Sequence, residues 1–429
     1  MNLVDDAAAM ELEQFILSNT TQLDFLRHGL NKSLNLFIDA YLEDYDFVYF
    51  VTDHAIDNAT VAGVFEPVNR PAEAGGGNEE EIAAGGYKTT GRTKGVVALP
   101  YFTGYYPPLA HETLHYWAVH FDKSFGFGKG KSESFFAHWG YADINGQLGG
   151  YDGRTLRCET PAGSLPPSCT PLSSGGYHYV LGGFGPNANG FRDLAYAPIE
   201  LYLMGLALPA EVPATIQQLT DADFVSISDD LSTTVVEAGG ISTLAFADIV
   251  ARHGTKAPLA TADRHFTAAF VVLSSQPAAD SVLTEVARWA AVFGGRETST
   301  GWKSFAGYTG GRATMDTSLK ARRDASTPAP PVRERFACNV VTQDCDRPEL
   351  ACRMSPPTFC GLAGSGTKGQ ACSRAADCAV GLDCYGSKCQ PFCDGSNTTS
   401  ASSCQTLCPG KSGSWKDSSG VAIAYICLN

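Results

Sequence analysis

The sequence carries little charge and has no long apolar run. Charged residues make up 18% of its 429 residues, and no stretch approaches the roughly 20 apolar residues of a membrane-spanning helix. Acidic residues outnumber basic ones by 45 to 31, which gives a net charge of -14. Nucleic-acid binding needs clustered Lys and Arg, so this balance argues against such a partner. Hydrophobic residues, at 44%, still allow a sizeable core, and the length predicts two or three domains.

Several common motifs are also missing. The chain has no G-x-S-x-G nucleophile elbow, no phosphate-binding G-x-x-x-x-G-K-[ST] loop and no dinucleotide-binding fingerprint. The first residues, MNLVDDAAAMELEQFIL, lack the basic and apolar regions of a signal peptide. We therefore expect that a signal peptide is absent from this sequence, or that export follows a route that the sequence does not show.

Cysteine is abundant but unevenly placed. Cys158 and Cys169 stand in one loop, and the other twelve of the fourteen cysteines lie between Cys338 and Cys427. The even count fits seven disulfides, which persist only in an oxidising compartment. This predicts a secreted protein whose thiols are too likely to be oxidised to serve as nucleophiles.

The cysteine-rich end differs in character from the rest of the chain. We expect a domain over residues 1–326, a Pro-rich linker over 327–336 and disulfide-stapled modules over 337–429. Units of about thirty residues with few large apolar side chains depend on disulfides for stability. Metal binding is the competing interpretation, but the spacings lack the paired C-x2-C steps of zinc modules. The cysteines form two similar sets, Cys338, Cys345, Cys352, Cys360 and Cys372, Cys378, Cys384, Cys389, and a less regular third.

The first 326 residues alternate between helical and strand-like patterns. Three-and-four spacing of apolar residues predicts helices, and β-branched or aromatic runs predict strands, which together indicate an α+β domain. The expected helices lie in 10–42, at the YYPPLAHETLHYWAVHF segment, from Ser132 to about Tyr141, in 194–208 and at SVLTEVARWAAVF. The expected strands are Asp46–His54, Gly95–Phe102 and FTAAFVVLS. Residues 67–94 are expected to form an exposed loop with at most one edge strand.

His111, Glu112 and His115 form an H-E-x-x-H motif. Positions i and i+4 share one face of a helix, so two imidazoles can bind a single zinc ion. The intervening glutamate can take a proton from a zinc-bound water, which then attacks a peptide carbonyl. The motif predicts a catalytic Zn²⁺ site with Glu112 as general base; two histidines on a structural helix are the alternative.

The chain resembles the zincin metallopeptidases, and more closely a set of secreted bacterial H-E-x-x-H proteins that often end in Cys-rich modules. The resemblance spans roughly residues 20 to 325 and rests on DYDFVYFV, HETLHYW, AHWGYADINGQLGGYD and YAPIELYLMGLALPAEVP. It implies a zincin-like catalytic domain and zinc-dependent hydrolysis of peptide bonds in extracellular proteins.

Zinc needs a third protein ligand. The metzincin pattern would place Gly and His where this chain has Ala118 and Phe121, so that subclass does not fit. In the resembling secreted proteins a His-Trp pair stands at the place of His138, which is our predicted third ligand. Glu133 is the gluzincin-like alternative. The remaining candidates are Asp143, Asp152 and His120, the last pointing away from the metal if the helix continues.

A few other residues are candidates for calcium binding or for supporting roles around the zinc. The segment Asp143–Gln147 gathers oxygen ligands around a turn glycine, as calcium loops do, but it lacks the closing acidic residue, and a plain β-turn is the alternative. Glu200 and Tyr202 are candidates to orient a ligand or to donate to an oxyanion. Met204 is either a methionine beneath the zinc or ordinary core.

Two functions compete with a secreted zinc endopeptidase. One is a catalytically inactive zincin-like binding protein that acts through its Cys-rich tail, and the other is a structural domain without metal. The tail itself is expected to recognise a surface or a substrate, or to act as a stabilising cap. Substrate preference lies in pocket geometry that the sequence does not reveal.

Overall fold

The computed structural model describes most of the chain between Leu30 and Leu428. The described residues are 30–52, 63–69, 87–100, 107–121, 123–131, 137–182, 194–228, 233–256, 263–274, 278–299, 301–318, 320, 332–333, 350–353, 359–362, 365–372, 377–385, 388–393, 411–416 and 422–428. Contacts divide the chain into two compact units. Unit 1 comprises Met1–Asn78 and Thr89–Ala329, and unit 2 comprises Glu79–Lys88 and Pro330–Asn429.

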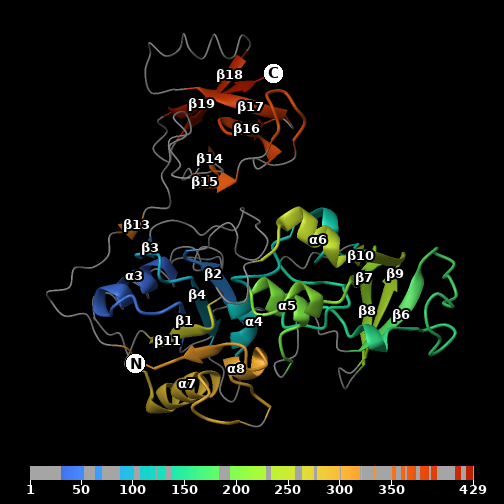
Figure 1. The fold of residues 1–429 in the computed structure, drawn as a ribbon, viewed down its shortest axis with the longest axis horizontal. Helices are drawn as coiled ribbons and strands as arrows, with labels where there is room; N and C mark the ends of the chain where they lie inside the picture. The colour runs from blue at the N-terminus through green and yellow to red at the C-terminus, as the bar shows by residue number, and fades with distance from the viewer. Residues whose placement is uncertain are drawn as a thin grey trace. The chain divides into compact units, whose positions relative to one another are not determined.

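A five-stranded sheet forms the centre of unit 1 (Figure 1). Its order is β12-β11-β1-β4-β2, and every neighbouring pair is parallel except β2 with β4. All six residues of β1 are buried, as expected for a parallel strand that is covered on both faces. The strands are β1 (Phe47–Thr52), β2 (Val64–Pro67), β4 (Gly95–Pro100), β11 (His265–Leu273) and β12 (Thr314–Asp316).

Helices cover this sheet. The helix α3 packs on β1 and β4, whereas α7 packs on β11, and Figure 1 shows the two helices on either side of the strands. Both helices are amphipathic and bury one stripe of apolar residues, which is the reason that these sequences fold as helices here. The helices of unit 1 are α3 (Leu30–Ala40), α4 (Leu109–Leu114), α5 (Pro198–Leu203), α6 (Phe246–His253), α7 (Asp280–Phe293) and α8 (Phe305–Tyr308), with short 3₁₀ turns at Lys123–Phe125, Gly153–Thr155 and Pro209–Glu211.

A smaller antiparallel region lies between the helices α4 and α6 in the sequence. A four-stranded sheet has the order β5-β6-β9-β8, and β7 pairs with β10. These strands enclose a second core of Tyr141, Tyr151 and Tyr179 with Leu and Val side chains. The strands are β5 (Arg157–Cys158), β6 (Tyr177–Gly182), β7 (Thr215–Thr220), β8 (Asp223–Ile227), β9 (Thr233–Ala238) and β10 (Gly240–Ala245). Cys158 and Cys169 form the disulfide expected from the sequence.

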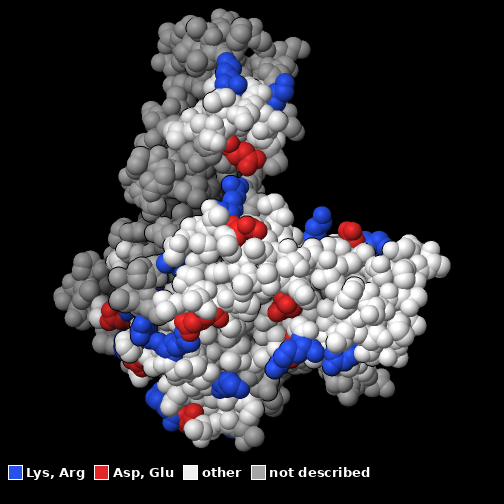
Figure 2. Space-filling view, turned by 45° about the vertical axis from the view of Figure 1, so that its right-hand side comes forward, with Lys and Arg blue, Asp and Glu red and all other residues white. Residues whose placement is uncertain are grey.

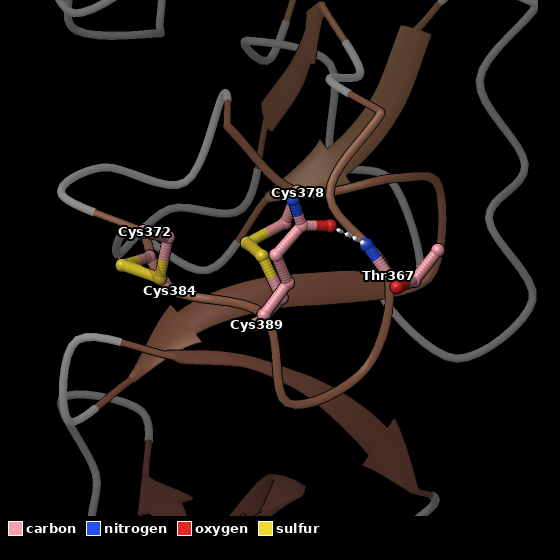
Figure 3. Close-up of a disulfide and its surroundings, with 6 residues drawn as sticks. Thr367, Cys372, Cys378, Cys384 and Cys389 are labelled. Carbon is pink, nitrogen blue, oxygen red and sulfur yellow. Dashed lines mark hydrogen bonds between the residues drawn. A yellow bond between two sulfur atoms is a disulfide. The ribbon is translucent and has the colours of Figure 1, made fainter.

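Unit 2 is built from short antiparallel strands and disulfides. In Figure 3, Cys372 pairs with Cys384 and Cys378 with Cys389, while Thr367 N donates to Gln370 Oε1 over 3.0 Å in the loop beside them. None of the described cysteines is free. The strands are β3 (Tyr87–Lys88), β13 (Val332–Arg333), β14 (Leu350–Arg353), β15 (Phe359–Leu362), β16 (Leu382–Tyr385), β17 (Lys388–Cys393), β18 (Lys411–Lys416) and β19 (Ala422–Leu428).

The α+β class predicted from the sequence is confirmed, with three corrections to individual elements. The helix that carries the H-E-x-x-H motif ends at Leu114 instead of continuing through Phe121. The expected helix from Ser132 to Tyr141 is wrong over the described residues 137–141, which are irregular because Ala137 takes a φ of 55°. Helical spacing over 194–208 yields only the six residues of α5. Most of the expected helix at 10–42 and of the linker at 327–336 lies outside the described residues.

Candidate metal centre

The helix α4 is short and wholly buried, and it is anchored to the central sheet. Leu109 and Leu114 pack in the main core. Thr113 donates from its hydroxyl to Leu109 O over 2.6 Å and shares a 2.5 Å hydrogen bond with the hydroxyl of Tyr49 on β1. These contacts fix the rotation of α4 about its axis, so the side chains of its other face have defined directions.

Three histidines converge at the end of this helix. Nε2 of His111 lies 3.3 Å from Nε2 of His115 and 3.2 Å from Nε2 of His138. The nitrogens of all three lie within 4.8 Å of one another. His115 follows the last residue of α4 but keeps helical dihedral angles, φ -57° and ψ -19°, so the i, i+4 relation with His111 survives the end of the helix.

The spacing of these nitrogens fits a tetrahedral metal ion. Two imidazole nitrogens at about 2.0 to 2.1 Å from a tetrahedral zinc ion stand about 3.3 Å apart. The two measured Nε2 separations from His111, 3.2 and 3.3 Å, match this value. His111 is buried whereas His115 and His138 are partly exposed, so the cluster reaches solvent on one side. The group can therefore hold a metal ion and leave a coordination position open.

A backbone carbonyl fixes the tautomer of His111. Its Nδ1 lies 2.6 Å from Gln147 O, and because a carbonyl oxygen only accepts, Nδ1 carries the hydrogen. Nε2 of His111 then presents its single lone pair to the nitrogens of both other histidines. Metal-ligating histidines commonly donate their second N–H to a carbonyl in this way.

Burial disfavours the charged form of His111 and of His115. Desolvation, with a further contribution from His138, lowers the pKa of His111 to about 3. Desolvation and the neighbouring His111, His138 and His120 hold the pKa of His115 well below its ordinary value. Neutral imidazole is the form that binds a metal, so at neutral pH protons do not compete for these two nitrogens.

His138 reaches the cluster from a loop whose backbone is strained. The preceding Ala137 has a φ of 55°, in the left-handed region. The following Trp139 is fully buried, its N donates to Leu148 O over 3.0 Å and its Nε1 donates to Glu200 Oε1 over 2.9 Å. With both neighbours held, the imidazole of His138 is directed to His111 without any helix.

Glu112, which follows His111 in the chain, has a buried carboxyl group. It is 4% exposed, and desolvation raises its pKa to about 8. A Cβ atom placed on Gly63 would lie 2.7 Å from Glu112 Oε1, so the carboxylate packs directly on the backbone that leads into β2. No sequence signal marked Gly63, because a single glycine before a short strand has no diagnostic pattern.

The other predicted ligand candidates have different partners. Nε2 of His120 lies 2.8 Å from His115 O, so His120 contacts the backbone of a cluster residue and does not join the nitrogens. Asp143 Oδ1 accepts from Gln217 N over 2.8 Å, and Asp152 caps a 3₁₀ turn and pairs with Arg154. Glu133 lies outside the described residues.

The described residues contain one further group with metal-ligand spacing, at Cys372, Cys378 and Cys389. Their sulfurs are in disulfides, which removes the thiolates that a metal would need. The segment Asp143–Gln147, considered as a calcium loop, forms a turn in which Asn145 has a φ of 49°. Its role as a calcium loop stays a prediction.

Tyr202 and Met204 lie in the main core beside α5. The hydroxyl of Tyr202 accepts from Lys256 N over 3.1 Å, and its ring packs edge-on against Phe246. These contacts give no support to its predicted role as an oxyanion donor. Met204 is buried as ordinary core would be, and its special role stays a prediction.

Comparisons with known proteins add no assignment, because no family model, no curated protein and no solved structure matches this chain. Within the described part of the chain, no helix is both long and apolar enough to cross a bilayer. On the face shown in Figure 2, Lys and Arg side chains are scattered among Asp and Glu over a mostly uncharged surface. The chemistry of the histidine cluster is therefore the main guide to function.

Proposed function

We propose that this protein is a secreted zinc-dependent endopeptidase with a zincin-like domain in unit 1. The observation that carries the proposal is the convergence of three imidazole nitrogens, with Nε2 of His138 and of His115 lying 3.2 and 3.3 Å from Nε2 of His111, next to the buried Glu112. Nitrogen-only ligation at this spacing suits zinc, and three protein ligands leave the open position typical of catalytic zinc sites.

The residues divide the chemistry between them. His111, His115 and His138 would hold the ion, which when bound supplies Lewis-acid polarisation of a carbonyl and lowers the pKa of water. Glu112 would accept the proton of the attacking water at its carboxylate and pass it to the departing amine. Burial suits Glu112 to this work, because it raises the pKa of the carboxyl group to about 8, closer to neutral pH, where a general base is most efficient, than the pKa of an exposed glutamate.

The fold supports a peptide as substrate. In the described sheet, β2 is one of the two edge strands and runs antiparallel to β4. An extended peptide can add to such an edge through main-chain hydrogen bonds. Gly63 immediately precedes β2 and contacts the carboxylate of Glu112, so a peptide aligned along this strand would pass the proposed general base.

The disulfides support a location outside the cytoplasm. Disulfides form in both units, among them Cys158–Cys169 in unit 1 and Cys372–Cys384 and Cys378–Cys389 in unit 2. Stable structural disulfides are typical of exported proteins. We extend the proposal to an extracellular protein substrate and to unit 2 as a module that binds a surface or a substrate.

Replacing Glu112 by Gln tests the proposal. The substitution removes the proton acceptor and keeps all three imidazoles, so zinc should remain bound while casein hydrolysis falls by about 10²- to 10⁴-fold. Glu297→Gln, at an exposed position, is the matched control and should retain both properties. Full activity of Glu112→Gln would refute the assigned role. Stoichiometric zinc in a wild-type protein that cleaves no member of a broad peptide library would favour the binding-protein alternative.

A further inference from the structure

The carboxylate of Glu200 is fully buried and surrounded by hydrogen-bond donors. Oε1 accepts from Trp139 Nε1 and from Leu148 N, both over 2.9 Å. Oε2 accepts from Gln147 N over 3.0 Å and from Ala197 N over 2.8 Å. Two donors on each oxygen satisfy an ionised carboxylate, which only accepts hydrogen bonds.

Only one of the four donors belongs to the helix that carries Glu200. The bond from Ala197 N caps the start of α5, as a glutamate at the third helical position often does. The other three donors come from Trp139, Gln147 and Leu148 in the preceding loop. Gly146 lies so close that a Cβ atom there would stand 2.3 Å from Glu200 Oε1. The loop is therefore wrapped around the carboxylate.

This loop supports two of the three clustered histidines. Trp139 directly follows His138, so the bond to its indole fixes the backbone that directs that imidazole. Gln147 donates its N–H to Glu200 and accepts the Nδ1–H of His111 at its carbonyl oxygen. Glu200 thus binds the neighbour of His138 in the chain, and it binds the residue whose carbonyl accepts from His111.

The segment before α5 reinforces the same arrangement. The hydroxyl of Tyr196 donates to Ala110 O, in α4, over 2.9 Å. The side-chain Nε2 of Gln147 donates to Leu194 O. Residues 194–200 thus contact both the helix that carries His111 and the loop that follows His138.

We propose that Glu200 is a positioning residue that holds His111 and His138 in metal-binding geometry through Gln147 and Trp139. The inference rests on the proposed function only in taking the cluster as a metal site. Hydrogen-bonded partners of this kind typically change metal affinity by about 10- to 100-fold when they are removed.

Zinc affinity measured by competition with a chromophoric chelator tests the inference without any assay of hydrolysis. Glu200→Gln keeps a side chain that can cap α5 but presents an NH₂ group to donors, so the zinc Kd should rise by about 10- to 100-fold. The matched control is Glu211→Gln, because Glu211 caps the turn Pro209–Glu211 through Leu208 N but is exposed and pairs with Arg312. This control should leave the zinc Kd unchanged.

A spectroscopic signature separates positioning from general destabilisation. With Co²⁺ in place of zinc, the visible absorption bands report the coordination geometry, and they should change in Glu200→Gln and not in Glu211→Gln. Unchanged zinc Kd and Co²⁺ spectrum in a folded Glu200→Gln variant would overturn the inference. If that variant does not fold, Trp139→Phe deletes one donor and keeps a buried ring. Its zinc Kd should rise by about threefold to tenfold, and an unchanged Kd would equally overturn the inference.

Because the readout is metal affinity, the outcome is independent of peptidase activity. A raised Kd in Glu200→Gln supports the positioning role even if the wild-type protein cleaves no peptide. An unchanged Kd in Glu200→Gln would overturn the positioning role without changing the interpretation of the Glu112→Gln experiment.

Discussion

The two units of this protein are stabilised in different ways. Unit 1 buries large side chains around its sheet, among them Trp139, Trp289 and Tyr49, and it holds buried polar groups such as Glu200 by complete hydrogen bonding. Among the unit 2 residues whose burial is described, the buried apolar side chains are Tyr87, Cys378 and Cys389, and the two cysteines are bonded to each other. The comparison indicates that a precise polar site needs a large core around it, whereas a small unit depends on covalent links.

Two disulfides allow the units to be compared directly. Cys158–Cys169 in unit 1 and Cys378–Cys389 in unit 2 both close loops with a sequence separation of 11. In the chain-entropy model, equal loops constrain the unfolded chain equally. Any difference between the consequences of losing them therefore reports on the surrounding unit.

The largest effect is expected from removing the proposed metal ligand that lies outside the motif, His138. His138→Ala should raise the zinc Kd by more than about 100-fold, beyond the loss typical of an outer hydrogen-bonding partner, because a coordinating nitrogen is lost. Isothermal titration or chelator competition measures this. His178→Ala is the control, since His178, on β6, pairs with Glu159 and is not part of the cluster. If His138→Ala binds zinc as tightly as the wild type, the third ligand is another residue, with Glu133 the next to examine.

The matched disulfides should give the next largest effect. Replacing both cysteines of either pair by Ser should cost about 2 to 5 kcal/mol of stability in the unit concerned. Unit 1 should stay folded without Cys158–Cys169, because its core remains, whereas unit 2 should lose its structure without Cys378–Cys389. Limited proteolysis followed by mass spectrometry locates the unfolded region.

Zinc content and hydrolysis of a short peptide should be unaffected by the unit 2 variant. Equal proteolytic resistance of unit 2 in both double variants would contradict the proposed difference between the units.

A smaller effect is expected at Gly63, where the backbone contacts the proposed general base, Glu112. Gly63→Ala places a Cβ atom 2.7 Å from Glu112 Oε1, so the carboxylate must move. The rate of hydrolysis should fall by about 10-fold or more, since small displacements of a catalytic group are costly, and the zinc Kd should not change. Gly240→Ala is the control, because its nearest neighbour, Thr220 Oγ1, is 3.8 Å from the added Cβ. Equal kcat values for the two variants would show that the lack of a side chain at Gly63 is not needed to position Glu112.

The strands and helices of the central sheet could be predicted because their sequences have one dominant pattern. The run from Asp46 is apolar on both faces and forms β1, and FTAAFVVLS and SVLTEVARWAAVF form β11 and α7. The six strands between Arg157 and Ala245 are not among the strands expected from the sequence. Their exposed and buried residues alternate over few positions, and several turns interrupt them, so no pattern extends far enough to be distinctive.

The candidate site could be predicted only in part. The spacing of His111 and His115 follows from helix geometry, and the structure brings His138 to them. The support around these histidines depends on contacts between distant segments. Gln147 acts through its backbone carbonyl, and Ala137 takes a left-handed conformation that its residue type does not favour. Neither feature leaves a signature in a single sequence.

Metal analysis combined with X-ray absorption at the zinc edge tests the central claim most directly. The account predicts one zinc ion per chain, with three imidazole nitrogens at about 2.0 to 2.1 Å and one further light-atom ligand. Histidine-ring scattering should diminish in His138→Ala. A protein purified without chelators that contains no zinc and takes up none, or a zinc spectrum dominated by sulfur at about 2.3 Å, would contradict the account.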